Sequence, residues 1–352
     1  MLLEGVFAAI TTPFYPDSRL YLRKLEHNVD RYSRTPLSGL VVLGSTGEAV
    51  MLGDDESREV LKTAREATAA DKVLIAGVAR ESVVQTLKLA EFAAEQNYDA
   101  VLVRTPNFYA PNMGNAAILN YYRMIADSSA LPVILYNIPR FTKYDLPVDV
   151  IAELAFHPNI IGLKDSSGRV ELIAAVVEAT KSVPRREVTV TEIFAAVTER
   201  MLEVQPSMEA ATFVSAEMLG GGGALAMAPP RPAIKTRTKE VGFQVLSGSP
   251  ATLVDSLDAG ASGAVLGLAA CAPQACLEIY MAWKDKDAAL AQEKQDRVRI
   301  ASIRVGAELG IAGIKYACDL NGYYGGPPRM PLLPLTADVK VEVAQIMDAI
   351  RN

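Results

Sequence analysis

Short hydrophobic runs recur along the chain, and polar stretches with helical periodicity separate them. Eight of these runs are nearly continuous in valine, isoleucine, leucine and alanine, which is the pattern of strands covered on both faces. They occupy Val6–Ile10, Leu40–Leu43, Val73–Ala76, Ala100–Val103, Val133–Tyr136, Ile160–Leu163, Phe243–Leu246 and Ala264–Leu266. Alternation of such strands with helices predicts βα units around a parallel sheet, here a (β/α)8 TIM barrel over residues 1–272.

The stretches between the runs carry signals for helix ends. Asp54 places an acid in a first helical turn, Ser82 can cap the next helix, and Pro147 stands at another first turn. After the eighth run, long amphipathic stretches predict about three further helices. We expect them to form a C-terminal helical subdomain over residues 273–352.

One gap between the sixth and seventh runs is much longer than the usual connection from a helix to a strand. This insertion, at about residues 183–241, holds a possible strand and helix at 187–201, the glycine run Gly220–Gly223, and a polar stretch at 228–240. Because it follows a helix and precedes a strand, we expect it to leave the barrel at the N-terminal face. The simplest interpretation is a partly ordered surface insertion, and the alternative is a subunit or partner contact.

Composition excludes several classes of protein. Lys and Arg number 35 against 41 Asp and Glu, for a formal net charge of -6, so we expect no nucleic-acid or anionic-membrane partner. Cys271, Cys276 and Cys318 follow no metal-ligand spacing and indicate reduced thiols, while two histidines exclude a site built on several of them. The chain shows neither the pattern of a signal peptide nor an apolar stretch that could span a bilayer, so we expect a cytoplasmic protein.

The sixth run ends in a lysine. The segment IIGLKDSSG places Lys164 at the C-terminal end of its strand, where (β/α)8 enzymes hold their catalytic residues. A lysine in apolar surroundings can act as an amine nucleophile. A structural ion pair between Lys164 and Asp165 is the alternative, and this segment alone leaves both open.

Two other runs end in candidate site residues. The second run leads into Gly44-Ser45-Thr46-Gly47, whose hydroxyls and closely spaced backbone amides can hold a carboxylate, although glycine-rich turns also serve packing. The fifth run ends at Tyr136, whose phenol can donate or accept a proton or can simply be half-buried at the barrel mouth. A barrel would bring these two segments and Lys164 to one pocket.

Three motifs on these strand ends resemble one enzyme family. GSTGE at Gly44–Glu48, YNIP at Tyr136–Pro139 and GLKDSSG at Gly162–Gly168 are similar to the signature segments of the dihydrodipicolinate synthase / N-acetylneuraminate lyase family. The resemblance covers most of residues 4–181 and 242–333, in order, and skips the insertion. Enzymes of this family are pyruvate-dependent aldolases that work through a Schiff base.

The resemblance implies a role for each matched residue. Lys164 would form the imine with the keto carbon of pyruvate, Tyr136 would shuttle protons, and Ser45 would relay them to Tyr136. Ser45 and Thr46, with the amides of their turn, would hold the 2-oxo acid carboxylate. The resemblance also places Gly248, Ser249 and Val265 at the pocket wall. It further implies that no metal or organic cofactor is needed, and that the chain assembles as a homotetramer or homodimer.

Two positions depart from the family pattern. Phe108 stands where the family often has a relay tyrosine, and the neighbouring Tyr109 is the alternative for that role. Phe141 stands where synthases of the family usually carry an arginine that binds the carboxylate of the second substrate, and Arg140 precedes it. Arg140 could substitute if the loop shifts, but the simpler interpretation is a second substrate other than aspartate semialdehyde.

The segments GYYGGPPRMPLLPL and DLPVDVIAELAFHPNIIGLKDSSG look closer to the 4-hydroxy-2-oxoglutarate aldolase branch of the family. We therefore expect an aldolase that cleaves a hydroxylated 2-oxo acid into pyruvate and an aldehyde or oxo acid, with dihydrodipicolinate synthesis as the alternative. A phosphate-binding barrel would also place glycines after the seventh and eighth strands, but it has no use for Lys164 and Tyr136. A non-catalytic binding protein is disfavoured by the same two residues.

Overall fold

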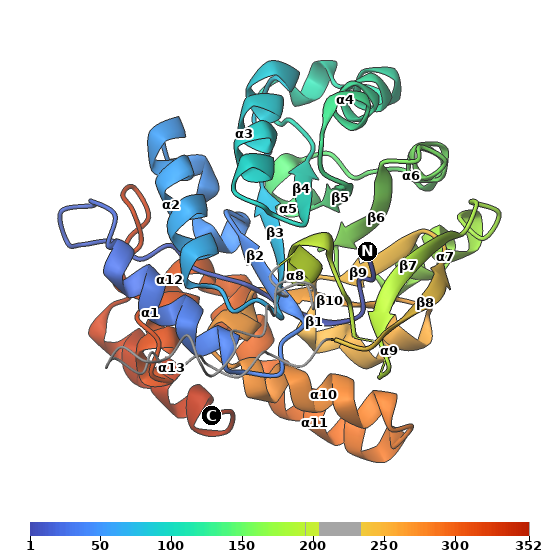
Figure 1. Ribbon diagram of the computed structural model, residues 1–352. Coiled ribbons are helices and arrows are strands. Elements are labelled where there is room, and N and C mark those ends of the chain that lie inside the picture. The colour runs from blue at the N-terminus through green and yellow to red at the C-terminus, as the bar shows by residue number, and fades with distance from the viewer. Residues whose placement is uncertain (194, 204–233, 352) are drawn as a thin grey trace, which may run out of the picture.

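A computed structural model describes residues 1–193, 195–203 and 234–351. Eight parallel strands close into a barrel in the order β1, β10, β9, β6, β5, β4, β3, β2, as Figure 1 shows. These strands are β1 Gly5–Ala9, β2 Gly39–Val42, β3 Val73–Gly77, β4 Ala100–Arg104, β5 Val133–Asn137, β6 Ile160–Asp165, β9 Gln244–Ser247 and β10 Gly263–Leu266. Each falls on one of the eight predicted runs, so the predicted (β/α)8 barrel is confirmed.

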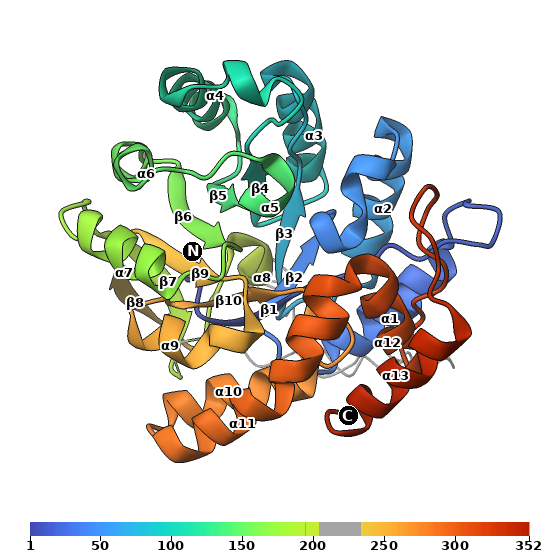
Figure 2. The same cartoon turned by 180° about the vertical axis from the view of Figure 1, so that it is seen from behind.

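Helices surround the barrel and continue past its last strand. They are α1 Leu22–Ser33, α2 Asp54–Ala67, α3 Val83–Glu95, α4 Asn115–Ser128, α5 Pro139–Thr142, α6 Val148–Ala155, α7 Val170–Ala179, α9 Leu253–Asp258, α10 Pro273–Lys284, α11 Ala288–Ala301, α12 Gly310–Leu320 and α13 Ala337–Asp348. The predicted cap of α3 forms, because the Ser82 hydroxyl accepts a hydrogen bond from the amide of Gln85. Figure 2 shows α12 and α13 beside α1, on one side of the barrel. Within the described ranges, no helix is long and apolar enough to cross a membrane.

The strands bury both faces, which explains why their sequences are almost continuously hydrophobic. On β4, Val101 and Val103 belong to the layer between the barrel and its helices, whereas Leu102 belongs to the cluster inside the barrel. On β5, Leu135 faces outward and Tyr136 faces inward by the same alternation. This period of two decides which side chain at each strand end points into the barrel mouth.

The described parts of the insertion leave the barrel at its N-terminal face, as predicted. Strands β7 Arg186–Thr191 and β8 Thr236–Val241 form an antiparallel hairpin, and α8 spans Glu199–Glu203. Arg200 of α8 donates to the backbone oxygen of Lys72, which directly precedes β3. Strand β8 was not predicted, because its residues are mostly exposed and polar. The glycine run 220–223 lies outside the described residues.

Candidate active site

Lys164 and Tyr136 are neighbours at the C-terminal end of the barrel. Their backbones are register partners on β6 and β5, and the Nζ of Lys164 lies 4.2 Å from the centre of the Tyr136 ring. Only 4% of Lys164 and 5% of Tyr136 is exposed to solvent. The structure thus places the predicted amine nucleophile against the predicted proton-transfer group, in surroundings from which water is largely excluded.

The structural alternative for Lys164, an ion pair with Asp165, does not form. The Asp165 carboxylate instead accepts hydrogen bonds from the Asn137 side-chain amide at 2.8 Å and from the Ser167 hydroxyl at 2.7 Å. Burial raises the pKa of Asp165. Because successive strand residues point to opposite faces, Asp165 faces away from the barrel interior and Lys164 faces into it. Among the described residues, Lys164 makes no ion pair.

The GSTGE segment forms a tight turn directly after β2. A short 3-10 helix at Ser45–Gly47 lies between two non-glycine residues with positive φ, Leu43 at 59° and Glu48 at 54°. Such backbone strain is found where the surrounding structure holds a functional loop in place. Part of that support comes from Gly77 of β3, where a Cβ would lie 2.0 Å from the Leu43 carbonyl oxygen.

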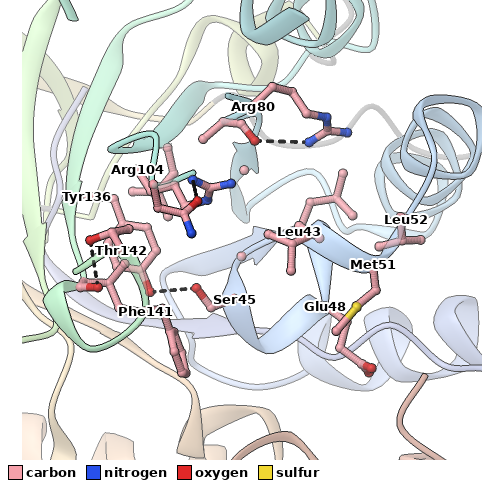
Figure 3. A pocket seen from close by; sticks show the side chains of 18 of the residues that line it. Leu43, Ser45, Glu48, Met51, Leu52, Arg80, Arg104, Tyr136, Phe141 and Thr142 are labelled. Carbon is pink, nitrogen blue, oxygen red and sulfur yellow. Dashed lines mark hydrogen bonds between the residues drawn. The ribbon is translucent and has the colours of Figure 1, made fainter. Parts of the chain in front are cut away.

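This turn brings Ser45 to Tyr136. The two hydroxyl oxygens lie 3.3 Å apart, and either group can be the donor (Figure 3). Thr46 is 9% exposed and stands beside Gly267, where an added Cβ would lie 3.1 Å from the threonine hydroxyl. The Gly47 carbonyl accepts a hydrogen bond of 2.7 Å from Thr12. The predicted proton path from Ser45 to Tyr136 therefore has the geometry it needs.

A cavity of about 600 Å³ opens above these residues. Gly44, Ser45, Tyr136 and Phe108 line it, whereas Lys164, which lies against the Tyr136 ring, is not among the lining residues. Much of the wall is apolar and comprises Leu43, Val50, Met51, Leu52, Leu102, Ile138, Phe141, Ile311 and Leu332. The cavity is large enough for a small substrate, and its apolar walls exclude water from the reacting groups.

Arg140 does not reach this cavity. Its guanidinium donates to the backbone oxygen of Ala307 at 2.5 Å, in the π-helical segment Ser302–Glu308 that precedes α12. Arg140 therefore ties the loop after β5 to the C-terminal helices, and its contact with substrate after a shift of this loop stays a prediction. Phe141 does line the cavity, so this position offers no cation to a substrate.

Phe108 and Tyr109 lie side by side on the surface. Phe108 is 76% exposed and Tyr109 is 62% exposed, and their rings meet edge to face at 5.0 Å. Within the described chain, the Tyr109 hydroxyl makes no hydrogen bond to Ser45 or Tyr136. The role of Tyr109 in the relay stays a prediction.

The remaining predicted pocket residues belong to the barrel wall. At Gly248 a Cβ would lie 2.2 Å from the Ser166 hydroxyl oxygen, so close packing of β9 on β6 requires glycine there. Ser249 is half-buried just past β9, and Val265 is buried in the cluster inside the barrel. Of the described residues that line the cavity, none is one of these three, and their contact with substrate stays a prediction.

A polar group on the cavity wall was missed from the sequence. Arg104, the last residue of β4, lines the cavity with Arg80, Glu81 and Asn107. The predicted run ends at Val103, one residue before Arg104. The alternation of side-chain directions along β4 indicates this position. Arg104 comes two residues after the inward-facing Leu102, so its side chain also points inward.

The C-terminal helices hold the GSTGE turn through a buried ion pair. Lys315 of α12 lies 2.5 Å from the carboxylate of Glu48, and the exposure of the two side chains is 0% and 1%. Burial lowers the pKa of Lys315, while Glu48 opposes that effect. Glu48 also accepts a hydrogen bond of 2.7 Å from the backbone amide of Arg329. The GYYGGPPR segment therefore packs at the catalytic end of the barrel.

We expect Lys315→Met to destabilise the protein by about 3–5 kcal/mol, because it leaves the Glu48 charge buried without its partner. Chemical denaturation measures the change. Lys88→Met, on the exposed face of α3, is the matched control and should change stability by no more than about 0.5 kcal/mol. Equal stability of the two variants would contradict this role for the ion pair, and adding Glu48→Gln to Lys315→Met should recover part of the loss.

Over the residues that the structure describes, no group of three or more His, Cys, Asp or Glu side chains is placed to hold a metal ion. Cys271, Cys276 and Cys318 are buried free thiols, and burial raises the pKa of each.

Comparison with known proteins gives a consistent result. The model of the dihydrodipicolinate synthetase family matches residues 2–184 and 231–350. A protein from Methanothrix thermoacetophila named 4-hydroxy-tetrahydrodipicolinate synthase is 26% identical over 346 residues, which cover 98% of this chain and 96% of that protein.

Two solved structures resemble the chain along its whole length. A dihydrodipicolinate synthase from Bacillus anthracis superposes with a TM-score of 0.79 at 20% identity, and the match covers 100% of both chains. A chloride-inhibited dihydrodipicolinate synthase from Acinetobacter baumannii, complexed with pyruvate, gives a TM-score of 0.78 at 23% identity over 99% of both chains. At these identities the likeness establishes the fold.

Proposed function

The chain belongs to the dihydrodipicolinate synthetase family, and from this premise we propose that it joins pyruvate to an aldehyde through an imine on Lys164. Members of this family are carbon–carbon lyases, and the chain is an enzyme of that class. The observation that carries the proposal is the buried Lys164 amine against the Tyr136 ring, with the Tyr136 hydroxyl 3.3 Å from Ser45.

The proposed chemistry begins at the Lys164 amine. Its nitrogen attacks the keto carbon of pyruvate, and loss of water from the carbinolamine leaves a protonated imine. The imine draws electrons from the neighbouring methyl carbon, which loses a proton and becomes an enamine. The enamine carbon then attacks the aldehyde carbonyl, and water later releases the product from Lys164. Every step uses this chain's own groups, so we propose that no metal or organic cofactor takes part.

Tyr136 and Ser45 supply the proton transfers in this proposal. The Tyr136 ring lies against the Lys164 amine, so its hydroxyl can protonate the departing oxygen of the carbinolamine and the oxygen of the attacked aldehyde. Ser45 passes the proton between Tyr136 and the cavity. The hydroxyls of Ser45 and Thr46, with the amides of their turn, hold the pyruvate carboxylate.

The comparisons favour the synthase over the 4-hydroxy-2-oxoglutarate aldolase that the sequence favoured. The Methanothrix relative carries the synthase name, as do the two similar structures. We therefore propose carbon–carbon bond formation between pyruvate and a semialdehyde as the reaction, with cleavage of a hydroxylated 2-oxo acid as its reverse.

Reduction with borohydride in the presence of pyruvate tests the proposal. We expect intact mass to increase by one reduced pyruvate per chain, and peptide mapping to place the adduct on Lys164. A folded protein that acquires no adduct, or acquires it on another lysine, would overturn the proposed function and return attention to a phosphate-binding or non-catalytic barrel.

We also propose assembly into a homodimer or homotetramer. The exposed pair Phe108 and Tyr109 supports it, because two large aromatic side chains at the edge of the cavity are covered most simply by another subunit. Light scattering on the purified protein decides the point, and a strict monomer would refute it.

A further inference from the structure

We propose that Arg104 selects the second substrate by binding a carboxylate on the end of the aldehyde that does not react. This inference rests on the proposed function, because it concerns the aldehyde that the Lys164 enamine attacks, or that leaves it in the reverse reaction. In this proposal Arg104, and not Arg140, binds the carboxylate of the second substrate.

The first support is the position of Arg104 in the barrel. The register pairs Arg104 of β4 with Tyr136 of β5, and Tyr136 with Lys164 of β6, so the three stand in one row across neighbouring strands. All three point into the barrel mouth by the alternation along their strands. Two strand spacings separate Arg104 from Lys164, or roughly 10 Å between backbones. Because both side chains extend inward from those backbones, an aldehyde held at the Lys164 enamine can direct its far end toward the guanidinium.

The second support is the way in which the guanidinium is held. One terminal nitrogen donates to the Thr105 carbonyl at 2.8 Å and to the Asn107 side chain at 3.1 Å, and the other donates to Glu81 at 3.1 Å. Within the described chain, the Nε of Arg104 has no hydrogen-bond partner. Nε and the terminal nitrogen beside it form the edge of a guanidinium that binds a carboxylate with two parallel hydrogen bonds.

Glu81 forms an ion pair with Arg104 at 3.1 Å and fixes the position of its guanidinium. The Glu81 carboxylate also accepts hydrogen bonds of 2.9 Å from the amides of Asn107 and Phe108. Burial acts to raise the pKa of Glu81, but these two amides and the Arg104 cation outweigh it, so that the pKa is lowered and Glu81 stays ionised. An anchored fork of this kind loses little freedom when a substrate binds.

The other cations near the cavity have partners elsewhere. Arg80 donates to the Ser57 hydroxyl at 2.8 Å and lies 3.3 Å from the carboxylate of Asp54, the first residue of α2. Arg140 is turned to the C-terminal helices, and Lys315 is buried against Glu48. Within the described chain, Arg104 is thus the arginine that lies in register with Tyr136 and Lys164 on neighbouring strands and points into the barrel mouth.

The test compares two four-carbon aldehydes that differ in charge, succinic semialdehyde and butanal, each with saturating pyruvate. For the wild-type protein we expect a higher kcat/KM with succinic semialdehyde. We expect Arg104→Met to lower that kcat/KM by about 10- to 100-fold, chiefly through KM, and to leave the value for butanal within about threefold. Arg104→Lys should lose an intermediate amount, because it keeps the charge and loses the fork.

Arg140→Met is the matched control, and its ratio of the two kcat/KM values should equal that of the wild type. Borohydride trapping of pyruvate on each variant shows that the protein is folded and that Lys164 is intact. A wild-type protein that forms the imine without preferring succinic semialdehyde, or an Arg104→Met protein that keeps the preference, overturns the inference. Loss of the preference in Arg140→Met also overturns it. A wild-type protein that forms no imine overturns the proposed function instead.

Discussion

Lys164→Ala protein is expected to show no turnover and to acquire no mass from pyruvate and borohydride. The substitution removes the amine that lies against Tyr136 at the barrel mouth, and a hydroxyl or phenol cannot form the imine in its place. Activity should fall to the detection limit of a pyruvate-consumption assay, while circular dichroism and the unfolding temperature show that the barrel is intact.

Lys143→Ala is the control for this result. Lys143 is an exposed lysine in the loop after α5, close in sequence to the cavity residue Phe141. Its removal should leave both turnover and the adduct unchanged. Turnover that survives in Lys164→Ala would eliminate the imine mechanism, even if the family and the fold stand.

The strands and the two central residues could be predicted because their signals are local. A strand covered on both faces must be hydrophobic at almost every position, so each barrel strand is visible as a run in the sequence. Lys164 and Tyr136 could be identified because each is a polar residue at the end of a hydrophobic run. The hairpin strand β8 lacks this signal. It pairs with β7, and most of its residues are polar and exposed, so no hydrophobic run marks it in the sequence.

The surroundings of the site could not be predicted in the same way, because they depend on contacts between distant segments. The partner of Glu48 lies on α12, and nothing in the GSTGE motif indicates it. The direction of Arg140 is likewise set by the carbonyl of Ala307, 167 residues later in the chain. Arg104 is an intermediate example, since the alternation along β4 points it inward but only the closed barrel places it in one row with Lys164.

Tyr136→Phe is expected to keep imine formation and to slow the proton-transfer steps by about 10²- to 10⁴-fold. The variant retains the ring that packs on the Lys164 amine and removes only the hydroxyl that lies 3.3 Å from Ser45. Borohydride trapping reports the imine. Exchange of the pyruvate methyl protons in deuterated water reports enamine formation, and kcat reports the whole reaction. We expect trapping to survive while exchange and kcat fall together.

Ser45→Ala separates the relay from a general loss of activity. If Ser45 acts through Tyr136, the double variant should be no slower than Tyr136→Phe alone, because residues that act as a unit are not additive. Independent roles would multiply the two losses and contradict the relay. A Tyr136→Phe protein with full exchange and full kcat would show that protons reach the substrate by another route, although Lys164 would keep its role as the nucleophile.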